Sequence, residues 1–362
     1  MMEVVVSSYS MIRVDRYYEA SLTELGLAAA KSIFENLKEK VEPDVVLIAN
    51  SYSEKTANQV LLSSKITRAL GFASPSFRVE SGDSSGGASI YAAYKMIKSG
   101  SVKTVLIIGA EKLSDFPSFY LNEILLQNME EEYESRVGVL PQSYSALRMK
   151  IYMKKYGVDY DYFVNWPYLM HKYGSENPYA YLKFQVDKDA VKNSQLISEP
   201  LRLFDTAARA DGAAAVLLAS EDVAKKIGDS DVKVKDVSSS SGHLEMDGIP
   251  SLRGAFTKMG RPKFDYLEVH DSYSIQAALI LEELGFTRGK SLEEIESVPV
   301  NFSGGLKSRG YPGGATGIYQ LIEAAMQLSG EFPGRRAQGV EKALVVSTDD
   351  LGYSSFLTYL SR

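Results

Sequence analysis

The sequence VESGDSSGGASIYAAYKMIKSG, from Val79 to Gly100, decides the fold of this chain. It indicates the end of a buried strand, a tight turn, and a helix that opens with two glycines. A turn of this kind normally presents a nucleophilic side chain just before the helix, and here that residue is Asp83. The chain contains no cysteine, so no other residue can supply a thiol.

The second half of the chain repeats this arrangement in GYPGGATGIYQLIEAAMQLSG, from Gly310 to Gly330. The Gly-Gly-Ala run of the first turn aligns with the Gly-Gly-Ala run of the second, and both helices end in Ser-Gly. The offset of about 230 residues is far longer than the repeat of a solenoid. We therefore predict an internal duplication that produces two similar half-domains, each contributing one turn to a shared site.

Short apolar runs alternate with amphipathic helical stretches, which is typical of an α/β protein with buried strands. We predict an N-terminal half over residues 1–225 and a C-terminal half over residues 226–362. The strand signal fades over residues 115–200, where tyrosines and charged residues accumulate. We interpret this segment as an insertion. It is either a surface subdomain that covers one half and supports pairing with another subunit, or a lid over a ligand channel.

The composition narrows the functional classes. The 362 residues are 45% hydrophobic and 24% charged, which fits a soluble globular protein with two core-forming units. The net charge of -6 offers no basic stripe for phosphates, so we expect no nucleic-acid partner. No apolar run reaches the ~18 residues that span a bilayer, and the N-terminus lacks a secretory pattern, so we expect no membrane association and a cytoplasmic location. His171, His243 and His270 lack metal-site spacing, and we predict no metal site.

Several ordered motifs resemble the thiolase family, in its archaeal and sterol-carrier-protein-x-type branch. The turn around Asp83 resembles the nucleophile turn of that family. EVHDSYS, at 268–274, resembles the His-Asp motif of the branch, and NFSGGLKSRGYPGGATG, at 301–317, resembles Asn-x-x-Gly-Gly followed by Gly-His-Pro-x-Gly-Ala-Thr-Gly. The resemblance covers nearly the whole chain. It implies a thiolase fold, with two similar α/β half-domains in a five-layered αβαβα arrangement and a loop domain inserted in the first half.

The resemblance also implies roles for individual positions. In active thiolases a Cys attacks the acyl-CoA, the His of the Gly-His-Pro motif takes its proton, and a C-terminal Cys supplies another acid/base group. At the matching positions this chain has Asp83 and Tyr311, and in the C-terminal loop Ser347 with the pair Asp349 and Asp350 stands where the family has a Cys and glycines. Only His270 is retained, in the His-Asp motif, where it would form part of an oxyanion hole.

The replacements predict a loss of ordinary thiolase chemistry. A carboxylate at the start of a helix keeps its charge and is a weak nucleophile toward a thioester. The mixed anhydride that Asp83 would form lies uphill from the thioester. Tyr311, with a reference pKa of ~10, cannot act as a general base near neutral pH, although it can donate a hydrogen bond. We therefore predict that this chain does not run ordinary thiolysis or condensation.

Each candidate residue keeps a second interpretation. Asp83 is a repurposed acid/base, an anion that repels the CoA thiolate, or a helix-capping residue. His270 is either an oxyanion-hole donor or a buried, hydrogen-bonded histidine. Six small residues either contact an acyl-pantetheine chain or serve only backbone packing and loop structure: Gly304, Gly305, Gly313, Gly314, Ser239 and Ser240.

Three functions fit these observations. The first is acyl-CoA binding or scaffolding without turnover. The second is an acyl-CoA acyltransferase or lyase with non-covalent chemistry, using Asp83, His270 and Tyr311. The third is a structural dimer whose pocket is filled by side chains. We expect no resident cofactor, with coenzyme A or an acyl-CoA as the ligand. The resemblance implies a homodimer or homotetramer, and a complex with an acyl-CoA synthase or a small zinc-ribbon/OB-fold protein.

Overall fold

The computed structural model describes residues 2–35, 37–228 and 230–362. In the N-terminal half, five strands lie side by side in the order β3-β2-β4-β7-β1. The neighbours β3, β2 and β4 are parallel, whereas β7 runs antiparallel to both β4 and β1. The bounds of these strands are β1 Val4–Met11, β2 Val45–Ala49, β3 Ser76–Val79, β4 Thr104–Glu111 and β7 Gly212–Ser220.

The C-terminal half repeats this strand order. Its strands follow the order β8-β11-β10-β9, and Val300 extends the series by a parallel bridge to Leu267 of β9. We number the strands of each half in chain order and count Val300 as the third of the C-terminal half. From the outer edge inward, both halves then show the same order: third, second, fourth, fifth, first. The predicted duplication is confirmed by this common topology. The strands are β8 Lys233–Ser241, β9 Tyr266–Glu268, β10 Lys342–Thr348 and β11 Ser354–Ser361.

The strands of the two halves join in one nine-stranded sheet, because β1 pairs antiparallel with β8 over two residue pairs. Helices α4 (Ser85–Lys98) and α14 (Thr316–Ser329) pack on each other and on strands of both halves, and so form the central helical layer. Helix α1 (Leu22–Glu35) and α3 (Leu62–Ala69) cover the outer face of the first sheet. Helices α10 (Pro250–Lys258) and α11 (Ser274–Glu283) cover the outer face of the second. The result is the predicted five-layered αβαβα arrangement.

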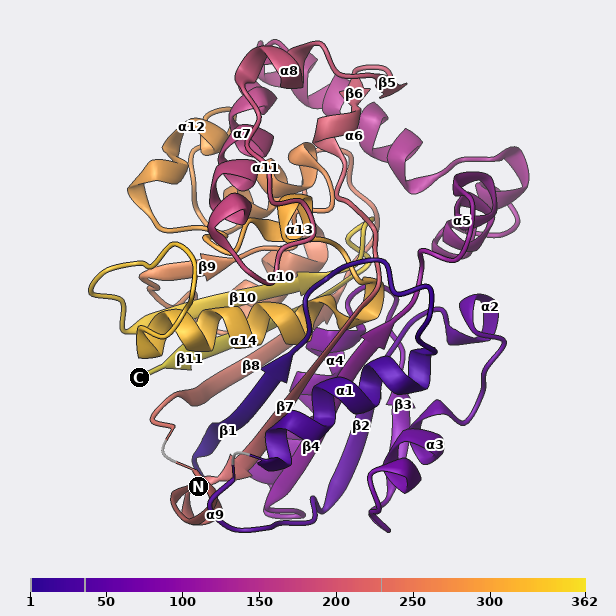
Figure 1. The fold of residues 1–362 in the computed structure, drawn as a ribbon. Helices are drawn as coiled ribbons and strands as arrows, with labels where there is room; N and C mark the ends of the chain where they lie inside the picture. Colours follow the sequence, from indigo (N-terminus) through magenta and orange to yellow (C-terminus); the bar gives the residue numbers. More distant parts are fainter. Residues whose placement is uncertain (1, 36, 229) are drawn as a thin grey trace.

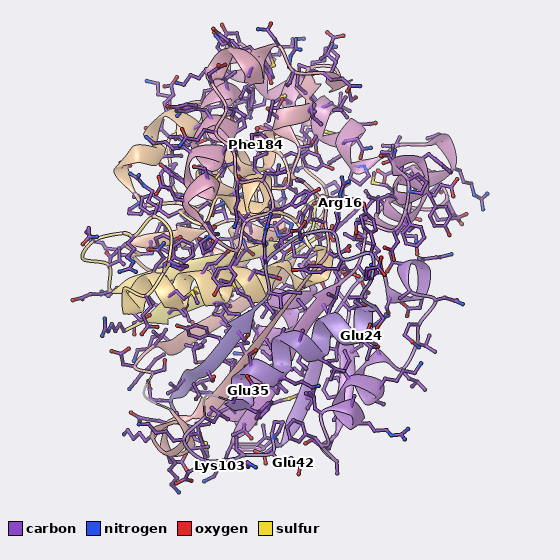
Figure 2. All side chains as sticks on the ribbon, in the orientation of Figure 1. Arg16, Glu24, Glu35, Glu42, Lys103 and Phe184 are labelled. Atoms are coloured by element: carbon purple, nitrogen blue, oxygen red, sulfur yellow. The ribbon has the colours of Figure 1, made fainter. Side chains whose placement is uncertain are left out.

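Burial follows from this layering. All eight residues of β4 are buried, because helices cover both faces of its sheet. Helix α1 shows the amphipathic alternative: Leu25 and Ile33 face the core, whereas Glu24 and Glu35 are exposed on the outside of the molecule (Figure 2).

The two central helices approach each other at glycines. A Cβ atom added to Gly86 of α4 would lie 2.8 Å from the Cα atom of Gly317 of α14. A methyl group does not fit between the two backbones, so the glycines that open both helices allow the half-domains to close on each other.

The segment predicted as an insertion forms several helices and a small two-stranded sheet. Helices α6 and α7 pack on the C-terminal half, against α11, α12 (Ser291–Glu294) and α13 (Gly305–Ser308), whereas α5 lies apart from them, above α2 (Ser53–Thr56) in Figure 1. The elements are α5 Ser118–Leu125, α6 Pro141–Tyr156, α7 Asp161–Glu176, α8 Lys188–Lys192, β5 Leu196–Ser198 and β6 Leu201–Arg202, followed after β7 by α9 Glu221–Ile227. None of the described helices is long and apolar enough to cross a membrane.

Candidate functional site

Asp83 lies in the turn between β3 and α4 and is fully buried. The turn is closed by backbone hydrogen bonds from Ser84 to Ser81 and from Ser85 to Gly82. The Tyr52 hydroxyl donates to Asp83 Oδ1 at 3.2 Å, and Arg209 Nη2 donates to Asp83 Oδ2 at 3.1 Å. Both carboxylate oxygens therefore already have donors from the protein.

Arg209 connects this turn to the C-terminal half. The same nitrogen, Nη2, donates to Asp350 Oδ2 at 2.5 Å. The guanidinium carbon also lies 4.2 Å from the centroid of the Tyr311 ring, in a cation–π contact. Backbone hydrogen bonds hold the two chain segments together, because Tyr311 N donates to Ala208 O at 2.9 Å. Arg209 is thus fixed by two carboxylates and one aromatic ring.

Tyr311 links Asp350 to His270. The Tyr311 hydroxyl donates to Asp350 Oδ1 at 2.6 Å and lies 3.0 Å from His270 Nε2. Because the hydroxyl proton is committed to Asp350, the neutral histidine must carry its proton on Nε2 and donate to Tyr311. All three side chains are buried. The structure thus brings together three of the four predicted catalytic positions, Asp83, His270 and Tyr311, and adds Arg209 and Asp350. These five residues are called the central network below.

The charges of the central network are unequal. Burial alone would raise the pKa of Asp83, but the charge and hydrogen bond of Arg209 outweigh it and place that pKa below its usual range. Burial raises the pKa of Asp350 to about 6, against the lowering effect of Arg209. Burial lowers the pKa of His270 to about 3 and keeps the imidazole neutral. Near neutral pH, Asp83 and Arg209 form an ion pair and Asp350 is the carboxyl group that titrates.

A pocket of about 350 Å³ lies directly over the central network. Arg209 and Tyr311 form part of its lining, whereas Asp83, His270 and Asp350 do not. The remaining wall combines α5 and neighbouring parts of the insertion with the segments before β7 and α11: Ser118, Leu121, Asn122, Leu125, Gln142, Ile197, Thr206, Ala207, Ser272 and Tyr273. The insertion therefore supplies one wall of the pocket, while its α6 and α7 also cover the C-terminal half.

The four glycines proposed as ligand contacts are all packed against protein atoms. A Cβ atom added to Gly304 would lie 2.6 Å from Gly174 Cα, and one added to Gly305 would lie 2.4 Å from Asp271 Oδ2. In the second turn, Gly313 faces the Glu111 side chain and Gly314 faces Ser51. These distances support the packing interpretation of the glycines.

The three serines lie outside the central network. The Ser347 hydroxyl is buried beside Gly87 and Gly317, and no described residue hydrogen-bonds to it. Ser239 and Ser240 belong to β8 and pair with β11, and Lys258 Nζ donates to the Ser239 carbonyl oxygen. None of the three lines the pocket over Tyr311. Among the candidates on the C-terminal loop, it is Asp350 that reaches the central network.

The other histidines do not form a site with His270. His171 is buried, and its Nδ1 lies 3.0 Å from the Phe184 carbonyl oxygen, whereas His243 is exposed. Within residues 2–35, 37–228 and 230–362, no group of three or more His, Asp or Glu side chains is arranged to hold a metal ion.

Arg209 was the main residue that the sequence did not predict. It stands in the run LFDTAARADG before β7, where small residues surround it. No spacing pattern marks it, because its partners Asp83 and Asp350 come from distant parts of the chain. The only available signal was an arginine directly before a strand expected to be buried on both faces, a place where a charge needs partners.

Comparison with known proteins identifies two family models. Residues 4–161 match the thiolase N-terminal domain, and residues 251–362 match the thiolase C-terminal domain-like family. The chain is 31% identical to an acetyl-CoA acetyltransferase of Methanothermobacter thermautotrophicus, over 100% of both chains. It is 30% identical to rabbit (Oryctolagus cuniculus) sterol carrier protein 2, over 75% of this chain and 55% of that protein.

Solved structures show the same fold. Human mitochondrial 3-ketoacyl-CoA thiolase superimposes with a TM-score of 0.80 at 16% identity, covering 99% of both chains. A structure titled Ltp2-ChsH2(DUF35) aldolase also gives 0.80, at 18% identity, covering 99% of this chain and 97% of that one. The two family models, the full-length relative and the shared five-layered architecture together establish that this chain belongs to the thiolase family, as its motifs predict.

Proposed function

We propose that this protein binds CoA thioesters in the pocket over Arg209 and Tyr311 and does not transfer acyl groups through a covalent intermediate. The observation that carries this proposal is the central network, in which the polar groups beneath the pocket already bind one another. Asp83, at the proposed nucleophile position, receives hydrogen bonds from Tyr52 and Arg209. A carboxylate with a lowered pKa and both oxygens engaged is a poor nucleophile.

The pocket itself supports binding. It is open above Tyr311, with a volume of about 350 Å³, and its wall mixes apolar and hydrogen-bonding side chains. Ligand sites in proteins are concave and combine these two kinds of lining. The family relationship supplies the ligand class, because the full-length relative is named an acetyl-CoA acetyltransferase. Tyr311 forms part of the pocket lining, and the pocket stays open in spite of the bulk of the tyrosine ring.

Two measurements test the proposal together. Calorimetric titration with acetyl-CoA is expected to give saturable heat, and incubation with acetoacetyl-CoA and CoA is expected to give no thiolysis above the uncatalysed rate. Turnover at enzyme-like rates by the unaltered chain would contradict the loss of acyl transfer. A lack of heat up to millimolar ligand would contradict binding and would favour a purely structural protein.

A second candidate function is an acyl-CoA lyase or acyltransferase with non-covalent chemistry, in which Asp83, His270 and Tyr311 take part. The observation that favours it is the contact of Tyr311, which lines the pocket, with Asp350, whose pKa is about 6. A buried carboxyl group that titrates near neutrality can exchange a proton through a tyrosine. The solved structure titled an aldolase shares this fold.

The lyase candidate is tested with β-hydroxyacyl-CoA thioesters and variants of the two carboxyl groups. If Asp83 is the base, Asp83→Ala abolishes cleavage. If the proton passes through Tyr311 to Asp350, Asp350→Asn abolishes cleavage and Asp83→Ala retains it. A complete lack of cleavage with thioesters that bind would rule this function out.

The assembly is part of the same proposal. We infer a homodimer or homotetramer, as implied by the family, which light scattering of the purified chain tests directly. The neighbour whose title names a DUF35 component supports a complex with a small partner protein. Affinity purification from source cells, with mass spectrometry of the bound proteins, is expected to recover a small zinc-ribbon/OB-fold protein or an acyl-CoA synthase.

A further inference from the structure

One wall of the pocket over Tyr311 is a single face of helix α5. Ser118, Leu121, Asn122 and Leu125 all line the pocket. The last three follow Ser118 by three, four and seven residues, which is the spacing of side chains that share one face of an α-helix. Asn122 therefore places a carboxamide on an otherwise largely apolar face. Its side chain is half-buried, at the boundary between the helix and the pocket.

A second carboxamide meets Asn122 from helix α6. Gln142 also lines the pocket and is half-buried. Its Nε2 donates to Asn122 Oδ1 at 3.2 Å, so the bond joins two helices of the insertion within the pocket wall. It uses one donor nitrogen of Gln142 and the acceptor oxygen of Asn122. Asn122 and Gln142 are called the amide pair below.

The amide pair keeps one free donor group and one free acceptor. No described residue forms a hydrogen bond with Asn122 Nδ2 or Gln142 Oε1, and neither atom is buried away from solvent. Because a single bond joins the two carboxamides, their free atoms lie close together. Because both side chains line the pocket, a ligand in the pocket can reach them. The amide pair therefore offers an N–H donor and a carbonyl acceptor, without charge, at one place in the wall.

A hydroxyl group fits this combination. It donates and accepts at one oxygen atom, whereas a trans amide directs its N–H and C=O to opposite sides, and a carboxylate only accepts. An alkyl chain against the amide pair would displace water and leave both free atoms without partners, which is costly. We propose that Asn122 and Gln142 bind a hydroxyl group on the acyl chain of a CoA thioester, and so select hydroxyacyl chains over plain alkyl chains. This inference rests on the proposed binding of CoA thioesters and narrows the ligand class.

A ligand series on the unaltered protein tests this selection. Butyryl-CoA, 3-hydroxybutyryl-CoA and 4-hydroxybutyryl-CoA share one chain length and differ only in the hydroxyl group. In calorimetric titration, we expect at least one hydroxy compound to bind about tenfold more tightly than butyryl-CoA. The reason is that the hydroxyl would form two hydrogen bonds, and a site built for a hydroxyl rejects the analogue that lacks it.

Two variants of similar size then assign the preference to the amide pair. Asn122→Leu and Gln142→Met remove the free polar atoms and keep the bulk of the wall. Each is expected to reduce the preference for the hydroxy compound to below about twofold, while butyryl-CoA binds as before or more tightly. Gln127→Met is the matched control, because Gln127 is exposed just beyond α5 and does not line the pocket. The control is expected to keep the full preference.

The outcomes separate the inference from the proposed function. Equal affinities of the unaltered protein for the three thioesters would overturn the selection and leave CoA binding intact. A preference that survives in both variants would place the hydroxyl elsewhere in the pocket and would also overturn it. Weaker binding of all three thioesters by one common factor in the variants would mean that the amide pair binds the pantetheine arm instead.

Absence of binding for every CoA compound would overturn the proposed function itself. If one of the two variants does not fold, the other variant and the ligand series on the unaltered chain decide the question.

Discussion

Asp83 and Asp350 accept hydrogen bonds from the same nitrogen, Nη2 of Arg209, at 3.1 and 2.5 Å. Asp83 belongs to the turn after β3, and Asp350 belongs to the loop between β10 and β11, so this shared cation joins the two half-domains at the centre of the molecule. Two buried carboxylates with one cation cannot both be fully compensated. The first two predictions follow from the opposite pKa shifts of the two carboxyl groups, lowered for Asp83 and raised for Asp350.

Asp83→Asn is expected to destabilise the protein more than Asp350→Asn at pH 7. Asp83 has a lowered pKa, so its ionised form stabilises the fold, whereas Asp350 has a raised pKa and its ionised form is unfavourable. We expect a loss of about 3 kcal/mol for Asp83→Asn and less than about 1 kcal/mol for Asp350→Asn. Urea denaturation of both variants measures the difference. An equal or larger loss for Asp350→Asn would show that Asp350 holds the main ion pair.

The stability contributed by Asp350 is expected to increase as the pH falls. Its pKa is about 6 in the folded protein and 3.8 in the reference state, so the folded protein binds more protons between these values. Relative to Asp350→Asn, the unaltered protein should therefore gain about 2 kcal/mol of stability between pH 7 and pH 4. The difference between the two pH profiles cancels the buried acids that do not share Arg209, and reports Asp350 together with its effect on Asp83. A difference that falls with decreasing pH would contradict the assignment.

The sequence predicted the fold more fully than the site. The Gly-Gly-Ala turns at Gly86 and Gly313 are local signals, and they indicated both the duplication and the central helices. The motif positions Asp83, His270 and Tyr311 do meet in space, because the topology places the two turns on adjacent central helices.

What the sequence could not give is the pairing of charges across distant segments. Arg209 carries no motif, and Asp350 was marked only by its place in the C-terminal loop, so their pairing follows from burial and from their contacts with each other and with Asp83. The resemblance at the C-terminus indicates Ser347 at the Cys position and the pair Asp349 and Asp350 beside it. Ser347 packs between the central helices instead, because a strand and a polar loop alone cannot fix the register to within three residues. The boundary at 225/226 stays a prediction.

Gly86→Ala is expected to destabilise the protein strongly. The added methyl group would lie 2.8 Å from the Cα atom of Gly317, and backbone on both sides prevents either helix from yielding locally. We expect a loss of about 2 to 3 kcal/mol, as for overpacking in a tight core. Ala92→Ser is the control, since it adds one heavy atom at a half-buried position of the same helix. Thermal unfolding of both variants measures the effect, and similar midpoints would show that the helices can separate at little cost.

Asp83→Cys would install the only thiol in the chain, which makes its titration unambiguous. The thiol would stand in the environment in which the charge and hydrogen bond of Arg209 outweigh burial for the carboxyl group of Asp83. The same balance should favour the thiolate and place its pKa below the reference value of ~8.5. The ultraviolet absorbance of the thiolate, measured below pH 9 to avoid tyrosine ionisation, reports this value. Asp83→Ser provides the baseline without a thiol, and a pKa above ~8.5 would show that burial dominates once the carboxylate is removed.

A reactive thiol alone is not expected to restore acyl transfer. Tyr311 would remain hydrogen-bonded to Asp350 and His270, and it would offer no base for the thiol. Asp83→Cys is therefore expected to show no thiolysis of acetoacetyl-CoA, and any gain should require Tyr311→His in the same chain. Comparison of the two single variants with the double variant checks this requirement. Thiolysis by Asp83→Cys alone would mean that Arg209 activates the thiol sufficiently without a general base, and that the nucleophile is the only missing group.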